Sequence, residues 1–188
     1  MAEPARVFVS GDEFFAFVKE AEGRWELVDG EMTMMAGANQ RRQDIAANTL
    51  ASLHAQLRGG KCRPTAADTA VAINGNIRYP DVVVDWGRRD DQALKATTPT
   101  LVIEVLSQST RLFDSHKKLN EYKSHPDIEY VVLIDTDSAR ALLHYRDGDV
   151  WRERVYQNMQ DVIEFPGLGA SLALSDVYFG LEFKTRLA

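Results

Sequence analysis

The sequence predicts an α/β (α+β) fold, and two kinds of local pattern support this prediction. A strand, a helix and a second strand follow one another within residues 100–135, an order that implies a parallel crossover. Tight turns at Asp29-Gly30, Asn74-Gly75 and Asp147-Gly148 each join two short segments, as in antiparallel hairpins. The 188 residues suffice for one hydrophobic core, so we expect a single domain, 1–188, with 1–9 as an extended N-terminal arm.

The composition places the protein among soluble, cytoplasmic proteins. The chain is 45% hydrophobic and 27% charged, and no apolar run approaches the roughly 18 residues of a membrane helix. Its first residues lack the features of a signal peptide. A single cysteine, Cys62, excludes an internal disulfide and a cysteine-based zinc cluster. The net charge of −6 argues against tight nonspecific DNA binding but not against a nuclease, because metal ions bring positive charge to an acidic site.

The first third of the chain predicts two helices and a hairpin. Ser10 and Glu13 match a capping box, and apolar residues recur at helical spacing until Gly23. A two-residue turn at Asp29-Gly30 places Glu26 opposite Thr33, with an apolar face formed by Trp25, Leu27, Met32 and Met34. From about Arg41 to Arg58 the pattern is again helical, and Gly59-Gly60 ends it.

The remainder predicts a sheet with one crossover helix. The segments TAVAI and IRYPDVVVDW flank the turn at Asn74-Gly75, and a polar loop then leads to a strand from about Thr100 to Leu106. A helix is expected from Asp114 to Ser124, entered through SQST, and the run IEYVVLID has the character of a strand buried on both faces. After the hairpin at Asp147-Gly148, the chain ends with a strand, a turn and a short final element.

Glu104 is the residue that points to chemistry, because it lies within the apolar stretch LVIEVLSQST. A buried carboxylate without a partner costs several kcal/mol or becomes protonated, so we expect a cation nearby. Asp81 opens the preceding strand, and carboxylates on neighbouring strands can converge on one Mg²⁺ ion. With Lys117 or Lys118 on the following helix, the set is that of metal-assisted phosphodiester hydrolysis. Two alternatives remain: Asp81 by itself favours a structural role, and Glu104 can belong to a buried structural ion pair.

The motifs WELVDGE, YPDVVV, LVIEVLSQST, FDSHKKLNEY, IEYVVLID and FPGLGASLALSDVYF together resemble the Uma-two family of restriction-endonuclease-like proteins, within the PD-(D/E)xK nuclease superfamily. The resemblance covers nearly the whole chain. It implies a restriction-endonuclease-like mixed sheet flanked by helices, a divalent metal site and nuclease activity. The superfamily usually has a lysine two residues after the glutamate, but Leu106 occupies that position here. In the family pattern the lysine has moved to the following helix, where the matching residue is Lys118.

Helical geometry favours the same lysine. At about 100° per residue, Lys118 lies roughly 40° from Tyr122 on the apolar side, whereas Lys117 points to solvent. The stem of Lys118 can therefore follow apolar surface and carry its ammonium inward. Lys123, on the other side of the apolar face, is the second candidate. Asp114, one turn before Lys118, can contact it or cap the helix.

Two further residues resemble functional positions of the family. Glu26 matches a glutamate in the family's Tyr-Glu-Leu segment and can add an acidic group to the metal site. On the sequence alone, Glu26 and Glu31 can equally well face water. Where the family often has a histidine, this chain has Arg42, which we consider a substrate-binding candidate along with Lys123.

We therefore expect a Mg²⁺- or Mn²⁺-dependent DNA endonuclease that acts as a homodimer. Asp81, Glu104 and the carbonyl of Val105 are the expected metal ligands, and Lys118 and Glu26 complete the catalytic set. One alternative is a catalytically inactive module of the same fold that binds nucleic acid or protein. The other is a structural domain with a buried Glu104–Lys118 pair and no metal.

Overall fold

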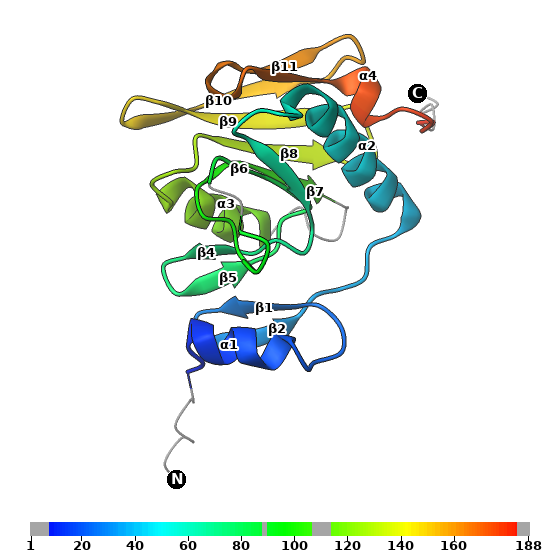
Figure 1. Ribbon diagram of the computed structural model, residues 1–188. Coiled ribbons are helices and arrows are strands. Elements are labelled where there is room, and N and C mark those ends of the chain that lie inside the picture. The colour runs from blue at the N-terminus through cyan, green and yellow to red at the C-terminus, as the bar shows by residue number, and fades with distance from the viewer. Residues whose placement is uncertain (1–7, 88–89, 107–113, 184–188) are drawn as a thin grey trace.

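The computed structural model describes residues 8–87, 90–106 and 114–183, and Figure 1 shows the arrangement of their elements. Residues 1–7, most of the predicted N-terminal arm, and the SQST segment lie outside the described part. The central sheet consists of six strands in the order β10 (Val150–Tyr156), β9 (Ala141–Asp147), β8 (Tyr130–Asp135), β7 (Pro99–Leu106), β6 (Val82–Asp85) and β3 (Arg63–Ala66).

The central sheet is mixed, as the sequence predicts. Strands β7 and β8 are parallel, and the other neighbouring strands are antiparallel. Helix α3 (Asp114–Ser124) lies between β7 and β8 in the chain, which confirms the predicted crossover. Strand β3 was not predicted. Its sequence, RPTA, contains a proline and has little apolar character, and it is recruited by pairing with the apolar β6.

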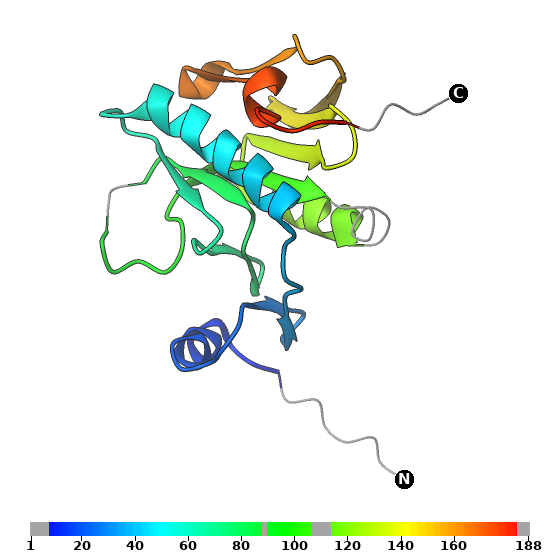
Figure 2. The ribbon, with the colours of Figure 1, turned by 90° about the vertical axis from the view of Figure 1, so that its right-hand side faces the viewer.

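The side chains of β7 alternate between two hydrophobic cores. Leu101, Ile103 and Val105 pack on the side of helix α2 (Gln40–Leu57), which crosses one face of the sheet in Figure 2. This core also includes side chains of β11 (Val162–Phe165), η1 (Pro166–Leu168), β12 (Ala170–Ala173) and α4 (Leu174–Val177). Val102 packs on the other face, with residues of α3. Because strand side chains alternate, Glu104 shares the face of Val102.

A second sheet has the strand order β2 (Glu31–Met34), β1 (Trp25–Val28), β5 (Asn76–Arg78) and β4 (Val71–Ile73). Helix α1 (Gly11–Val18) contributes to its core and begins with the predicted capping box of Ser10 and Glu13. Asp29 and Gly30 both have positive φ angles, 50° and 78°, as a type I′ turn requires. Glu26 pairs with Thr33, as predicted.

The segment IRYPDVVVDW divides between the two sheets. Only its first residues form the predicted hairpin, in β5, and the chain then enters β6 of the central sheet. Pro80 lies at the division, where it cannot donate a backbone hydrogen bond and restricts Tyr79 to an extended conformation. Asp81 therefore lies where the chain passes from one sheet to the other. Across the described ranges, no helix combines the length and apolar character needed to cross a bilayer.

Candidate active site

Asp81 and Glu104 lie next to each other on neighbouring chain segments. The antiparallel register pairs Val82 with Ile103 and Val83 with Val102, so the next position places Asp81 opposite Glu104. Both side chains belong to the α3 face of the sheet, because they alternate with Val82 and Ile103 on the α2 face. Directly opposite residues have Cβ atoms about 5 Å apart, so both carboxylates can reach a common ion.

Glu104 is buried against two groups of α3. The residue is only 5% exposed, and its Oε1 accepts a hydrogen bond of 2.7 Å from the Tyr122 hydroxyl. The ammonium of Lys118 lies 4.0 Å from the same oxygen. Burial raises the pKa of Glu104 to about 7, and the charge of Asp81 acts in the same direction, against the opposing effect of Lys118. An additional cation would therefore stabilise the ionised form of Glu104 and lower its pKa.

Asp81 is held by the main chain of β7 and by α2. Its Oδ2 accepts a 2.7 Å hydrogen bond from the amide of Val105. The same oxygen accepts bonds of 2.9 and 3.3 Å from Nη2 and Nε of Arg42, in the first turn of α2. Burial acts to lower the pKa of Arg42, but the carboxylate of Asp81, together with those of Glu104 and Glu26, outweighs burial and raises the pKa. Arg42, a substrate-binding candidate from the sequence, is therefore the ion-pair partner of Asp81.

Glu26 faces the interior of the molecule, whereas Glu31 is exposed. Glu26 Oε1 accepts bonds of 2.9 Å from Lys118 and 3.3 Å from the amide of Tyr79. Its Oε2 accepts a 3.0 Å bond from Nη1 of Arg78. Burial acts to raise the pKa of Glu26, but Lys118 and Arg78 outweigh burial and leave the pKa below its usual value. Glu26 therefore holds the ammonium of Lys118 close to Glu104.

Arg78 is a component that the sequence reasoning missed. Its residue is 1% exposed, and it donates to Glu121 from Nε at 2.7 Å and from Nη2 at 2.8 Å, besides its bond to Glu26. The sequence does indicate this role, because Arg78 lies within the strand segment NIRY. A buried cation there needs a partner of opposite charge, as the buried Glu104 does. The role of the Tyr122 hydroxyl was also missed, because helical spacing only placed Tyr122 on the apolar face of the helix.

The three lysines of α3 have different surroundings. Lys118 is half-buried between Glu26 and Glu104, on the side predicted from helical geometry. Lys117 forms an ion pair with Asp29 at the surface. Lys123 lies over Trp151, with Nζ 5.8 Å from the ring centroid, and lines a neighbouring cavity rather than the one containing Glu104. The side chain of Asp114 lies outside the described part of the chain.

Five of these polar groups line a cavity of about 280 Å³ between β7, α3 and the β1–β2 hairpin, whereas Asp81 is not among its lining residues. Its polar lining comprises Glu26, Thr33, Arg42, Glu104, Lys118 and Tyr122, and its apolar lining includes Met34, Leu106, Leu119 and Leu133. Opposite charges thus meet inside a partly apolar enclosure. In such surroundings, electrostatic interactions are stronger than at an open surface.

The oxygen atoms of this site supply some, but not all, of the ligands that a hard divalent cation needs. In the described ranges, no three side chains of His, Cys, Asp or Glu are grouped closely enough to hold a metal ion. The described hydrogen bonds to Asp81 all end on Oδ2, and the one to Glu104 ends on Oε1. One oxygen of each carboxylate thus remains for a ligand role. Two carboxylates, a carbonyl such as that of Val105 and several waters would suit Mg²⁺, which usually keeps part of its water shell.

The raised pKa of Glu104 makes the free energy of unfolding depend on pH. Between its ordinary pKa of 4.5 and the folded value of about 7, the folded protein retains a proton that the unfolded chain has lost. Stability therefore falls as the pH rises through this window, by on the order of 3 kcal/mol, and then stays level. The Glu104→Gln variant lacks this decrease.

Urea unfolding in EDTA at about pH 5 and pH 8 checks this prediction. The free energy of unfolding of Glu104→Gln minus that of the parent should be more positive at pH 8 than at pH 5. An equal difference at both pH values would show that Glu104 titrates as an ordinary carboxyl group.

Comparison with known proteins supports the architecture. "Uncharacterized protein slr1290" from Synechocystis sp. is 29% identical over 180 residues, which are 93% of this chain and 94% of the relative. A second uncharacterized Synechocystis protein, sll1609, is 26% identical over 142 residues, which are 73% of this chain and 80% of that protein. A crystal structure from Anabaena variabilis, described as a "putative nuclease belonging to DUF820", superposes with a TM-score of 0.71 at 18% identity.

The Anabaena alignment covers 90% of this chain and 97% of the other, which confirms the predicted fold class. Residues 12–175 match the sequence model of a family named Uma2 and described as "Putative restriction endonuclease". Because this match spans most of the sequence, the chain belongs to the Uma2 family.

Proposed function

We propose that the protein is a metal-dependent endonuclease that hydrolyses phosphodiester bonds of DNA, with Mg²⁺ or Mn²⁺ as its cofactor. The observation that carries this proposal is the position of Asp81 opposite Glu104, with the ammonium of Lys118 4.0 Å from Glu104. Membership of a family described as "Putative restriction endonuclease", and the likeness in fold to a structure described as a "putative nuclease", support the same class of reaction.

Each residue has a role that follows from its contacts. Asp81, Glu104 and the carbonyl of Val105 would hold the ion, which when bound lowers the pKa of a coordinated water and neutralises charge on the phosphate. Lys118 can orient the attacking water or stabilise the negative charge that develops on the phosphate oxygens. Glu26 positions Lys118 through its 2.9 Å bond. Because Glu26 also contacts Arg78, it is already neutralised and we assign it positioning rather than metal binding.

The direct test is a cleavage assay with purified protein. Supercoiled plasmid, linear duplex and single-stranded DNA are incubated with Mg²⁺, with Mn²⁺ or with EDTA. The proposal requires cleavage of at least one DNA substrate with a divalent ion and none with EDTA. Absence of cleavage under all these conditions would contradict it, and cleavage of RNA alone would change the substrate.

The two adjacent lysines provide a matched pair of variants. Lys118→Ala is expected to reduce the cleavage rate by roughly 100-fold, because it removes the cation next to Glu104 and Glu26. Lys117→Ala should stay close to the parent rate, since Lys117 pairs with Asp29 at the surface. Initial rates of plasmid nicking measure both effects. Equal losses in the two variants would contradict the role given to Lys118.

One observation favours the catalytically inactive binding module as a second candidate. The guanidinium of Arg42 already lies on Asp81, at 2.9 Å, and so supplies the positive charge that a metal ion would otherwise bring. Ion binding at Asp81 then competes with Arg42. The inactive module predicts DNA binding without cleavage even at high Mn²⁺ concentration, so the cleavage assay combined with a binding assay distinguishes the two candidates.

The homodimer also stays a proposal. An endonuclease with one site per chain cuts both strands of a duplex most simply as a pair with two-fold symmetry. Light scattering of the purified protein measures the mass directly. A mass of one chain, 21.1 kDa, would exclude a stable homodimer under the conditions used.

A further inference from the structure

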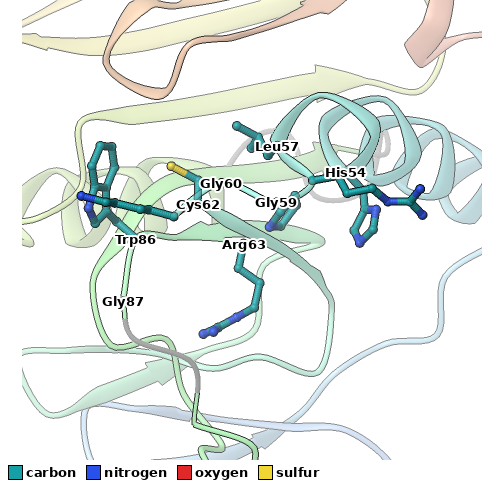
Figure 3. A pocket seen from close by; sticks show the side chains of 11 residues that line it. His54, Leu57, Gly59, Gly60, Cys62, Arg63, Trp86 and Gly87 are labelled. Atoms are coloured by element: carbon teal, nitrogen blue, oxygen red, sulfur yellow. The ribbon is translucent and has the colours of Figure 1, made fainter.

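A second pocket lies at the opposite end of α2 from Arg42. Its volume is about 520 Å³, and it is formed by the end of α2, the start of β3 and the end of β6. In Figure 3, Trp86 lies on one side of this pocket and His54 on the other. Four of its side chains are basic, His54, Arg58, Lys61 and Arg63, and no described acidic residue lines it. This basic lining is unexpected for a chain with a net charge of −6.

Trp86 is exposed, and hydrogen bonds hold the backbone on which it stands. Its residue is 44% exposed, and its amide donates a 2.9 Å hydrogen bond to the carbonyl of Thr98. Asp85 Oδ1 accepts bonds of 2.7 Å from the amide of Thr98 and 3.2 Å from that of Gly87. A Cβ atom at Gly87 would lie 2.6 Å from Thr97 Cβ, so this close approach requires glycine. A tryptophan side chain has only two χ angles, so it loses little conformational entropy when it binds a ligand.

The basic side chains of this pocket are not equivalent. Arg63 donates a 2.8 Å hydrogen bond to the fully buried Asp85, so its guanidinium is oriented and its charge is partly neutralised. Arg58 and Lys61 are exposed, and neither forms an ion pair with a described carboxylate. Gly59, with φ of 78°, allows the turn between them. Two exposed basic side chains thus line the same pocket as an exposed indole ring.

Resting on the proposed nuclease function, we propose that this pocket binds an unpaired nucleotide of the substrate. The base stacks on Trp86, and Arg58 and Lys61 contact the neighbouring phosphates. An indole can stack only on a base whose face is free, so the ligand is a single-stranded segment rather than an intact duplex. Aromatic side chains within a basic groove are the usual way in which proteins hold single strands.

The position of the pocket relative to the candidate active site suits this role. Asp81 and Trp86 lie at the two ends of β6, five residues apart, or about 17 Å along an extended strand. The pocket includes Leu57 and Cys62 of the core on the α2 side, whereas Asp81 lies on the α3 face, so a bound strand would pass around the edge strand β3. At about 3.4 Å per stacked nucleotide, the connection needs at least about five nucleotides. The pocket would therefore contact a substrate strand at least about five nucleotides from the bond that is cut, and it makes DNA with a single-stranded portion the favoured substrate.

Fluorescence anisotropy with a labelled single-stranded oligonucleotide and its duplex, in EDTA, measures binding without cleavage. Trp86→Leu is expected to weaken single-strand binding about 10-fold or more without changing its dependence on salt. Arg58→Gln and Lys61→Gln should each reduce the slope of log affinity against log salt by about 0.7. The matched controls are Phe179→Leu, 78% exposed, and Arg154→Gln on β10, which should bind as the parent does.

The proposal is overturned if Trp86→Leu binds the single strand as tightly as the parent, or if the parent binds duplex at least as tightly as single strand. Circular dichroism checks that the variants are folded. Should Trp86→Leu not fold, the salt slopes of the Arg58 and Lys61 variants decide instead. Binding that depends on Trp86 without any cleavage would support the pocket and reject the nuclease. Cleavage combined with single-strand binding that does not depend on Trp86 would support the nuclease and reject the pocket.

Discussion

Replacing Glu104 with glutamine is expected to lower the rate of DNA cleavage by roughly 100- to 1,000-fold. Glutamine retains the shape of the side chain and can still accept the hydrogen bond from Tyr122, but it removes the negative charge opposite Asp81. A divalent ion would then lose one of two carboxylate ligands. Asp81→Asn should have an effect of the same order, because it removes the other. Initial rates of plasmid nicking at saturating Mn²⁺ provide the measurement.

The control for these variants is Glu164→Gln, an exposed carboxylate on β11 away from the cavity. It should cleave at the parent rate. Circular dichroism spectra and melting temperatures establish that all three variants are folded. If Glu104→Gln or Asp81→Asn cleaves as fast as the parent, these residues do not form the catalytic centre, even though the fold brings them together.

Arg78→Met is expected to lower the free energy of unfolding by about 3–5 kcal/mol. Methionine can fill much of the space but leaves Glu26 and Glu121 without the guanidinium to which both are bound, at 3.0 and 2.7 Å. Burial acts to lower the pKa of Arg78, but its bonds to Glu121 and Glu26 outweigh burial and raise the pKa, so Arg78 is charged at every pH of interest. Urea unfolding at neutral pH measures the loss.

A second substitution tests the reason for that loss. Adding Glu26→Gln to Arg78→Met should recover part of the stability, because it removes a carboxylate that the first change leaves unpaired. The control is Arg154→Met on the exposed part of β10, which should change stability by no more than about 0.5 kcal/mol. A loss for Arg78→Met as small as that of the control would show that the buried network contributes little to the fold.

The features of the fold that were predictable are those set by local sequence. The turn at Asp29-Gly30 needs two residues with positive φ, and the residues that adopt such angles most readily are present there. The crossover around α3 follows from three consecutive elements. Strand β3 and the division of IRYPDVVVDW between two sheets were not predictable, because both depend on pairing with partners distant in the sequence.

The same distinction applies to the candidate site. Glu104 was identified because a charge within an apolar strand has a high energetic cost, and helical spacing was enough to place Lys118 on the inner side of α3. The partners of these residues were harder to find. The contact of Arg42 with Asp81 depends on how α2 lies across the sheet, and the bonds of Arg78 join β5 to β1 and α3. Such contacts are set by tertiary packing, which a single sequence does not reveal.

Calorimetric titration with Mn²⁺ tests most directly whether Asp81 and Glu104 hold one cation. We expect one bound ion per chain in the parent protein and a large loss of affinity in both Asp81→Asn and Glu104→Gln. Binding should also be tighter at pH 8 than at pH 6, because Glu104, with a pKa of about 7, must lose its proton to act as a ligand. Absence of binding by the parent, or binding that neither substitution weakens, would contradict a metal centre at this position.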